Sequence, residues 1–275
     1  MEAHNQVVPW GINRVFGDEI YSFDTWELKT GTGVGVAVLD TGIDCRHPDL
    51  RVVGGVNTVD NTNYCSDRNG HGTHVAGTIS ALDNDRGVVG VAPDIDLYGV
   101  KVLSDNGGGT SASVANGILW AIEQDNVKII NMSLGGGHSL TMERAVADAY
   151  EAGVLLVASA GNSGSESVSF PAAYSNVIAV SATNNNDGFA SFSSFGSEVE
   201  LTAPGVSVLS TLPRNSYGSL NGTSMASPHV AGVAALVWGA DSSLSNSDVR
   251  AVLQNTAQDI ELPVKRRDTA WLELI

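Results

Sequence analysis

Hydrophobic runs and mixed stretches alternate along most of the chain. The run 33–39 contains only apolar residues and glycine and leads into Asp40, as expected for a strand buried on both faces of a parallel sheet. The same patterning predicts further strands at 96–102, 127–132, 154–158 and 177–182, and helices at 73–82, 111–124, 140–152, 223–239 and 247–254. Because strands and helices alternate, we expect one α/β domain (1–275) whose mostly parallel central sheet is flanked by helices.

Polar residues and glycines come at the ends of three of these strands. Asp40 ends the first strand, and the segments Asn131-Met132-Ser133 and Ser159-Ala160-Gly161-Asn162 end two others. In open α/β sheets, ligands bind beyond the carboxyl ends of the strands. The sequence therefore predicts a functional site at this rim of the sheet.

Composition and charge narrow the choice of partners. The 275 residues carry 30 acidic and 14 basic side chains and a formal net charge of −16, so the surface should repel nucleic-acid phosphates and anionic lipids. Either an ordinary acidic protein or adaptation to high salt explains this charge, and the scarcity of lysine favours the second. The longest apolar run, 230–238, is too short to span a membrane. We expect neither a nucleic-acid nor a membrane partner.

The first motif with candidate chemistry surrounds Ser224. The sequence Gly222-Thr223-Ser224-Met225-Ala226 leads into an apolar helix, where unpaired N–H groups and the helix dipole favour negative charge. A serine nucleophile would benefit from this position, because its attack on a carbonyl creates an oxyanion. An ordinary helix-capping serine is the alternative.

The second motif places His71 between two glycines at the start of another helix, in Asn69-Gly70-His71-Gly72-Thr73-His74. A neutral imidazole can take a proton from a serine hydroxyl and return it to a leaving amine. His71 and His74 could also be metal ligands, but neither a third ligand nor an H-E-x-x-H pattern accompanies them. We therefore expect His74 to be structural.

The third motif is Val38-Leu39-Asp40-Thr41-Gly42, in which a carboxylate leaves a buried strand. A carboxylate in this place can fix the tautomer of an imidazole and stabilise its cation. Aspartic proteases also use D-T-G, but they need two such motifs, and the sequence contains no second one. The motif therefore favours a partner for His71.

Taken in the order Asp, His, Ser, the three motifs resemble the subtilisin-like serine peptidases, or subtilases, over about residues 6–257. The resemblance implies the three-layer α/β fold of that family and a serine endopeptidase that works through an acyl-enzyme. Implied catalytic residues are Asp40, His71 and Ser224 as the triad and Asn162, whose side-chain amide donates to the oxyanion together with the backbone N–H of Ser224.

The resemblance also implies where a protein substrate binds. Glycines allow an extended peptide to pair with the edge of the enzyme's own chain, and no acidic residue lies in the expected walls of the pocket for P1, the residue before the scissile bond. We expect broad specificity with a preference for large apolar P1 residues. The implied substrate-binding residues are Gly107, Gly108, Gly109, Ser133, Leu134, Gly135, Ser159, Ala160 and Gly161.

A structural calcium site is a further implication, in the loop 82–88 that follows the helix of His71. An all-oxygen ligand set suits Ca²⁺, whereas a polar surface loop in an acidic chain is the alternative. The implied ligands are the side chains of Gln6, Asp49 and Asn84 and the carbonyl oxygens of Leu82, Arg86 and Val88.

Cys45 and Cys65 bear on where the protein acts. They form either a disulfide, which is favoured in a secreted protein, or two free thiols. The first residues lack the pattern of a secretory signal, so the chain resembles a mature enzyme made with an N-terminal propeptide, or else a cytosolic processing subtilase. We expect the secreted, extracellular form, acting as a monomer, and a halolysin-like member of the family is the narrower expectation.

Two departures from the family stand out. One is the cysteine pair, and the other is the segment 258–275, which is locally basic and ends apolar where subtilases usually close with a glycine-rich segment. A catalytically silent subtilase fold used for binding is the rival from another class, although all four catalytic positions are intact. A serine esterase is disfavoured, because G-x-S-x-G is absent around Ser224.

Overall fold

The computed structural model describes residues 6–16, 30–60, 63–260 and 272–273. The described helices are α1 (Trp10–Phe16), α3 (His71–Ser80), α4 (Ser111–Ile122), α5 (Leu140–Glu151), α6 (Thr223–Ala240) and α7 (Asn246–Thr256). The described strands are β1 (Gly35–Asp40), β2 (Val52–Asn57), β3 (Asp96–Lys101), β4 (Val127–Met132), β5 (Leu155–Ser159), β6 (Val177–Thr183), β7 (Val199–Pro204), β8 (Val208–Leu212), β9 (Ser216–Leu220), β10 (Gln258–Asp259) and β11 (Leu272–Glu273).

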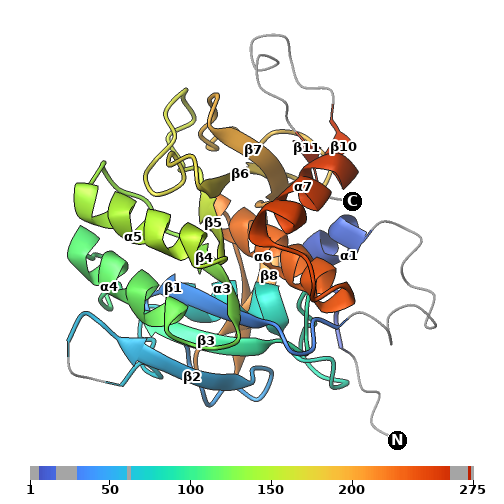
Figure 1. The fold of residues 1–275 in the computed structure, drawn as a ribbon. Helices are drawn as coiled ribbons and strands as arrows, with labels where there is room; N and C mark the ends of the chain where they lie inside the picture. The colour runs from blue at the N-terminus through green and yellow to red at the C-terminus, as the bar shows by residue number, and fades with distance from the viewer. Residues whose placement is uncertain (1–5, 17–29, 61–62, 261–271, 274–275) are drawn as a thin grey trace, which may run out of the picture.

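A central sheet organises the described part of the molecule, with the strand order β10-β11-β7-β6-β5-β4-β1-β3-β2. From β2 to β11 the neighbouring strands run parallel, and β10 alone pairs antiparallel at one edge. Helices α4 and α5 lie on one side of the strands, and α6 and α7 lie on the other (Figure 1). The mostly parallel sheet flanked by helices, which the alternating pattern predicted, is confirmed.

Strand β1 shows why this sequence needs two covering layers. All six of its residues are buried. Val36 and Val38 pack in a core with α3 and α6, whereas Ala37 and Leu39 pack in a second core with α4 and α5. Because successive side chains of a strand point to opposite faces, an uninterrupted apolar run can be buried only between two layers of helices.

Several elements escaped the sequence analysis because their patterns are weak. Strand β2 contains two glycines and is only partly buried, while β7 places polar residues such as Thr202 in the interior. Strands β8 and β9 form a hairpin outside the main sheet. None of these segments combines the length and apolar density that mark β1 or β5.

The segment 258–275 is described in two short pieces. Strand β11 pairs in parallel with β7, and β10 pairs with β11, so both pieces extend the edge of the sheet. Residues 261–271 and 274–275 lie outside the described part of the chain. Of the helices that are described, none has the length and apolarity required to cross a lipid bilayer.

Candidate active site

Asp40 and His71 meet where β1 ends and α3 begins. The Nδ1 atom of His71 lies 2.8 Å from Oδ1 and 2.9 Å from Oδ2 of Asp40, whose side chain is fully buried. The backbone N–H of Thr41 donates a further bond to Oδ1 at 2.7 Å. Because an ionised carboxylate can only accept, Nδ1 of His71 is the donor, and Nε2 is left to accept a proton.

The negative charge of Asp40 governs the protonation of His71. Its Coulomb attraction raises the pKa of His71 above the usual 6.5, against the opposing effect of burial. The hydrogen bond that His71 donates to Asp40 and the charge of Asp67 also raise this pKa. The imidazole is therefore both oriented and made more basic by its surroundings.

Asp67, which the sequence analysis did not single out, holds the start of α3 in place. Its Oδ2 accepts hydrogen bonds from the backbone N–H and the hydroxyl of Thr73, at 2.9 and 2.6 Å, and its Oδ1 accepts from the N–H of Gly70 at 2.8 Å. The Thr41 hydroxyl donates to the same Oδ1 at 3.0 Å and accepts from the N–H of Gly72. One carboxylate thus joins the turn after Asp40 to the helix that begins at His71.

Ser224 lies in the first turn of α6, opposite the end of β4. Its hydroxyl oxygen is 3.3 Å from the carbonyl oxygen of Ser133, and the Ser133 hydroxyl donates to the carbonyl of Ser224 at 2.8 Å. Behind them, Asn131 donates to the Ser133 hydroxyl at 3.0 Å and accepts from Ser227 at 2.6 Å. These bonds fix the start of α6 against the rim of the sheet.

Asn162 presents its amide beside the same helix start. Its Oδ1 accepts from the backbone N–H of Thr223 at 2.9 Å and from the Thr223 hydroxyl at 3.1 Å. An ideal Cβ built on Gly222 would lie 3.6 Å from both the Nδ2 atom of Asn162 and the backbone nitrogen of Ser224. Two N–H donors therefore flank one small space beside Gly222, which is the arrangement that an oxyanion requires.

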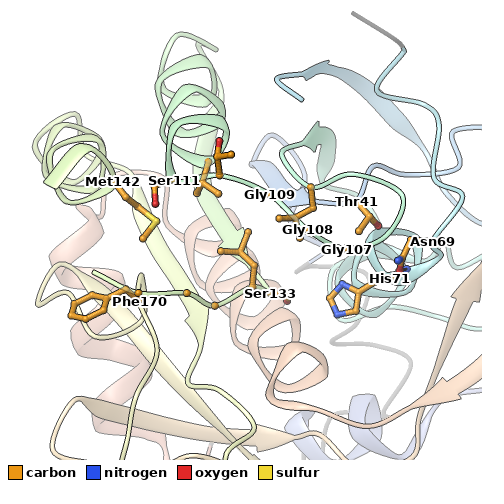
Figure 2. Close-up of a pocket in the computed structure, with 17 residues that line it drawn as sticks. Thr41, Asn69, His71, Gly107, Gly108, Gly109, Ser111, Ser133, Met142 and Phe170 are labelled. Atoms are coloured by element: carbon orange, nitrogen blue, oxygen red, sulfur yellow. Dashed lines mark hydrogen bonds between the residues drawn. The ribbon is translucent and has the colours of Figure 1, made fainter. Parts of the chain in front are cut away.

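A cavity of about 550 Å³ extends from His71 along the segments that follow the carboxyl ends of β3 and β4. Figure 2 shows His71 and Asn69 at one end and Met142 and Phe170 at the other. Six of the predicted substrate-binding residues line it: Gly107, Gly108, Gly109, Ser133, Leu134 and Gly135. The apolar walls supplied by Leu103, Met142 and Phe170 were not predicted, because nothing in the local pattern of a helix or loop reveals which distant cavity a side chain lines.

The remaining predicted substrate residues, Ser159, Ala160 and Gly161, do not line this cavity but lie next to it. The Ser159 hydroxyl donates to the carbonyl of Leu134 at 3.4 Å. The N–H of Gly161 donates to the Thr223 hydroxyl at 3.1 Å. The end of β5 is therefore joined both to the segment after β4 and to the helix of Ser224.

Oxygen atoms of the predicted calcium ligands gather at the loop after α3. The side-chain amide of Gln6 donates to the carbonyl oxygens of Leu82 and Val88, at 2.6 and 3.1 Å, and the side-chain oxygen of Asn84 accepts from the N–H of Arg86 within the loop. Among the described residues, no hydrogen bond joins the Arg86 carbonyl to the other predicted ligands. The loop thus brings the Gln6 side chain together with two of the three predicted carbonyl ligands.

Asp49 gives this loop an unusual feature. The side chain is fully buried, and Oδ2 accepts from the N–H of Val88 at 3.1 Å, yet Oδ1 has no hydrogen-bond partner among the described residues. Burial, followed by the charge of Asp49, raises the pKa of the nearby Tyr217 hydroxyl to about 12. A buried carboxylate oxygen without a partner is costly, and a hard cation would satisfy it.

His74 lies in the interior, away from any cluster of ligands. Its Nε2 is 2.9 Å from the carbonyl oxygen of Val208 and 3.1 Å from that of Gly218, and burial lowers its pKa to about 4. Within the described residues, no group of three or more His, Cys, Asp or Glu side chains could hold a metal ion. The geometry agrees with a structural histidine that joins α3 to the β8–β9 hairpin.

Cys45 and Cys65 form a disulfide, with their Cα atoms 5.1 Å apart. The bond joins the turn that follows β1 to the segment that precedes Asp67. It therefore links the stretch after Asp40 to the stretch before His71, and of the two alternatives that the sequence left open, the structure contains the disulfide.

Comparisons with known proteins agree with this architecture. The model of the subtilase family matches residues 31–272. The chain is 54% identical to alkaline elastase YaB from Bacillus sp. (strain YaB), over 93% of this chain and 66% of the relative. It is 50% identical to subtilisin DY from Bacillus licheniformis and 51% identical to subtilisin Savinase from Lederbergia lenta, each over 93% of both chains. The resemblance drawn from the motifs is thus confirmed, and the chain belongs to the subtilase family of serine endopeptidases.

Proposed function

We propose that this chain hydrolyses peptide bonds within proteins, using Asp40, His71 and Ser224 as a catalytic triad. The observation that carries the proposal is the Asp40–His71 pair at the carboxyl end of β1, at 2.8 Å, beside the cavity that extends from His71. Membership of the subtilase family and the names of the relatives, which are subtilisins and alkaline proteases, support the same activity.

The reaction proceeds by acyl transfer in two halves. The Nε2 atom of His71 takes the proton of the Ser224 hydroxyl as its oxygen bonds to the peptide carbonyl carbon. The resulting oxyanion is held by the Asn162 amide and the Ser224 N–H. His71 then gives the proton to the leaving amine as the C–N bond breaks. In the second half, water attacks the acyl-enzyme, with His71 taking its proton and returning one to Ser224. Asp40 stabilises the imidazolium that forms in each half.

The substrate lies extended between the segments 107–109 and 133–135. Four of these six residues are glycines, which leave the backbone accessible for pairing with an extended peptide. Met142 and Phe170 line the end far from His71, and Leu103 adds a further apolar wall (Figure 2). We expect broad specificity with a preference for large apolar residues at P1.

A structural calcium ion completes the proposal. Asp49, one oxygen of which has no partner among the described residues, and the carbonyls of Leu82 and Val88 fit a hard cation. Gln6, Asn84 and the Arg86 carbonyl are the further candidate ligands. The bound ion supplies positive charge, which stabilises the folded chain. Backbone bonds also join Val7 to this loop, since its N–H donates to the carbonyl oxygen of Gly87 at 2.8 Å and its own carbonyl oxygen accepts from the N–H of Val89 at 3.2 Å.

The mature enzyme acts outside the cell, after removal of a propeptide. The disulfide supports this proposal, because reducing compartments keep most thiols unpaired. The net charge of −16 further supports a salt-adapted enzyme, since added ions screen the repulsion between acidic side chains.

Cleavage of casein by the wild type and by a Ser224→Ala variant tests the proposal. We expect the wild type alone to release peptides, in high salt with calcium, and a serine-reactive inhibitor to stop it. Equal activity of both proteins would show that Ser224 is not the nucleophile. A folded wild type that cleaves nothing would instead favour a silent subtilase fold used for binding.

A further inference from the structure

A second cavity, of about 530 Å³, adjoins the first at the end marked by His71. Asn69 lines both cavities, and it lies with His71 at the end of the first cavity opposite Met142 and Phe170 (Figure 2). Gly70, the residue directly before His71, also lines the second cavity. The two cavities therefore meet beside His71, the candidate catalytic histidine.

Two parts of the chain form the walls of the second cavity. One is the segment 65–70, which begins at the disulfide and leads to His71, and the other is the end of the β8–β9 hairpin, residues 212–216, with Asp44 beside them. An ideal Cβ on Gly70 would lie 3.3 Å from Pro213 and 3.5 Å from Leu212. The hairpin end thus packs directly against the residue that precedes His71.

Two arginines line this cavity in a strongly acidic protein. Arg68 and Arg214 are both exposed. Arg68 has only a distant ion pair, 3.9 Å from Asp105, with 79% of its side chain exposed, and the guanidinium of Arg214 makes no hydrogen bond or ion pair with the described residues. We name the second cavity, lined by these two residues, the arginine cavity.

The carboxylates of the arginine cavity are already occupied by other donors. Asp44 accepts the backbone N–H of Arg46 at 3.1 Å through Oδ1 and that of Arg214 at 2.9 Å through Oδ2. Asp67 is buried, and its oxygens accept the bonds that hold the start of α3. The carboxylates are therefore held by backbone N–H groups and threonine hydroxyls, whereas the two exposed guanidinium groups, of which Arg68 has the 3.9 Å ion pair with Asp105, can turn towards an incoming anion.

We propose that the arginine cavity binds an acidic side chain of the substrate, carried by one of the first three residues after the scissile bond. The inference rests on the proposed endopeptidase function, in which the residues before the scissile bond lie along the segments 107–109 and 133–135. A protein substrate continues beyond the bond that is cut, and so its leaving portion passes His71 on the side of the arginine cavity. There a carboxylate meets Arg68 and Arg214, which can bind it through charge-assisted hydrogen bonds.

Quenched fluorescent peptides of one sequence test this inference. Glu or Gln is placed at the first, second or third position after the scissile bond, and mass spectrometry verifies that the same bond is cut. We expect Glu to raise kcat/KM over Gln by about fivefold at one of these positions at low salt, which is typical of a partly exposed ion pair, and high salt to reduce that ratio.

Arginine variants assign the effect to the cavity. Arg68→Gln and Arg214→Gln should each lower the ratio of kcat/KM for Glu over Gln, and the double variant should bring it close to one. Arg144→Gln is the matched control, because Arg144 is exposed on helix α5 and lines neither cavity, and it should keep the full ratio.

The outcomes separate this inference from the function on which it rests. Cleavage with equal kcat/KM for the Glu and Gln peptides at all three positions would overturn the arginine cavity alone. The same holds if the double variant keeps the preference for Glu. No cleavage of any peptide by a folded wild type would overturn the endopeptidase function and the inference with it.

Discussion

Two buried aspartates, nine residues apart in the sequence, have opposite surroundings. Asp40 and Asp49 are both fully inaccessible to solvent. Both oxygens of Asp40 are engaged, by His71 and by the N–H of Thr41. In Asp49 one oxygen accepts from Val88, and the other has no partner among the described residues.

The difference shows how the surroundings of a buried carboxylate indicate its role. A buried charge is tolerated when opposite charge and hydrogen bonds offset the loss of water. For Asp40 the chain itself provides hydrogen bonds to both oxygens, so that residue can act on His71. For Asp49 the described residues provide a hydrogen bond to only one oxygen, so that residue is suited to bind a cation from outside the chain.

Exchanging each aspartate for asparagine gives the largest expected contrast. Asp40→Asn should lower kcat by about 10⁴, because the imidazole loses its orienting charge, a magnitude measured on relatives of the family and on other serine proteases. Asp49→Asn should leave kcat within about twofold, at a temperature where both variants are folded. Initial rates on one peptide substrate, with circular dichroism to verify folding, decide the matter. A similar loss of kcat in both variants would end the distinction between the two aspartates.

Asn162→Ala should have the next largest effect. The Oδ1 atom of Asn162 is held by Thr223, which leaves its Nδ2 group as the candidate donor to the oxyanion. Loss of the corresponding donor in subtilisin lowers kcat about 10²–10³-fold, and we expect the same here with little change in KM. Steady-state kinetics measure both parameters. An increase in KM at constant kcat would assign Asn162 to substrate binding instead.

The disulfide joins two residues that lie between Asp40 and His71 in the sequence, and its removal should affect stability more than chemistry. Its cysteines are 20 residues apart, so that loss of the cross-link should lower the free energy of unfolding by about 3 kcal/mol. Urea unfolding of Cys45→Ser/Cys65→Ser, made in the inactive Ser224→Ala background to prevent self-digestion, measures the change. Reductant should destabilise the parent to the same extent and leave the double variant unaffected.

Removal of calcium should destabilise the protein through Asp49. At a free calcium concentration 100-fold above its Kd, binding adds about 2.7 kcal/mol, so chelation should lower Tm by roughly 5–10 °C. The measurement again uses Ser224→Ala. Asp49→Asn should abolish the response to chelator, whereas Asp85→Asn, an exposed neighbour in the loop, should preserve it. A chelator effect that persists in Asp49→Asn would place the ion elsewhere.

The smallest effect concerns the pH dependence of activity. Because His71 must be neutral to accept a proton, kcat/KM falls as the pH drops through its pKa, which Asp40 raises above 6.5. We expect the acid limb of the profile to have its midpoint above 6.5. In Asp40→Asn, the residual activity should have this midpoint at lower pH, since the main cause of the raised pKa is gone. An unchanged midpoint would show that another group titrates.

Much of the fold was predictable because the decisive patterns are local. The apolar run before Asp40 and those near 129 and 156 predicted buried parallel strands, and β1, β4 and β5 occupy those places. The weakly patterned β2 and β7 were not predicted, since glycines and buried polar residues hide their burial. The hairpin β8–β9 escaped for the same reason.

In the candidate site, too, local patterns were predictable and long-range contacts were not. The sequence by itself singled out the candidate catalytic residues Asp40, His71 and Ser224, because glycines and strand or helix ends beside them form local motifs, and the resemblance of those motifs to the subtilases added Asn162. Only the tertiary structure decided that Asp67 joins the turn of Asp40 to the helix of His71, that one oxygen of Asp49 has no hydrogen-bond partner within the described part of the chain, and that Arg68 and Arg214 share a cavity. These relations join residues far apart in the chain, and contacts of that kind follow from packing, which no local periodicity encodes.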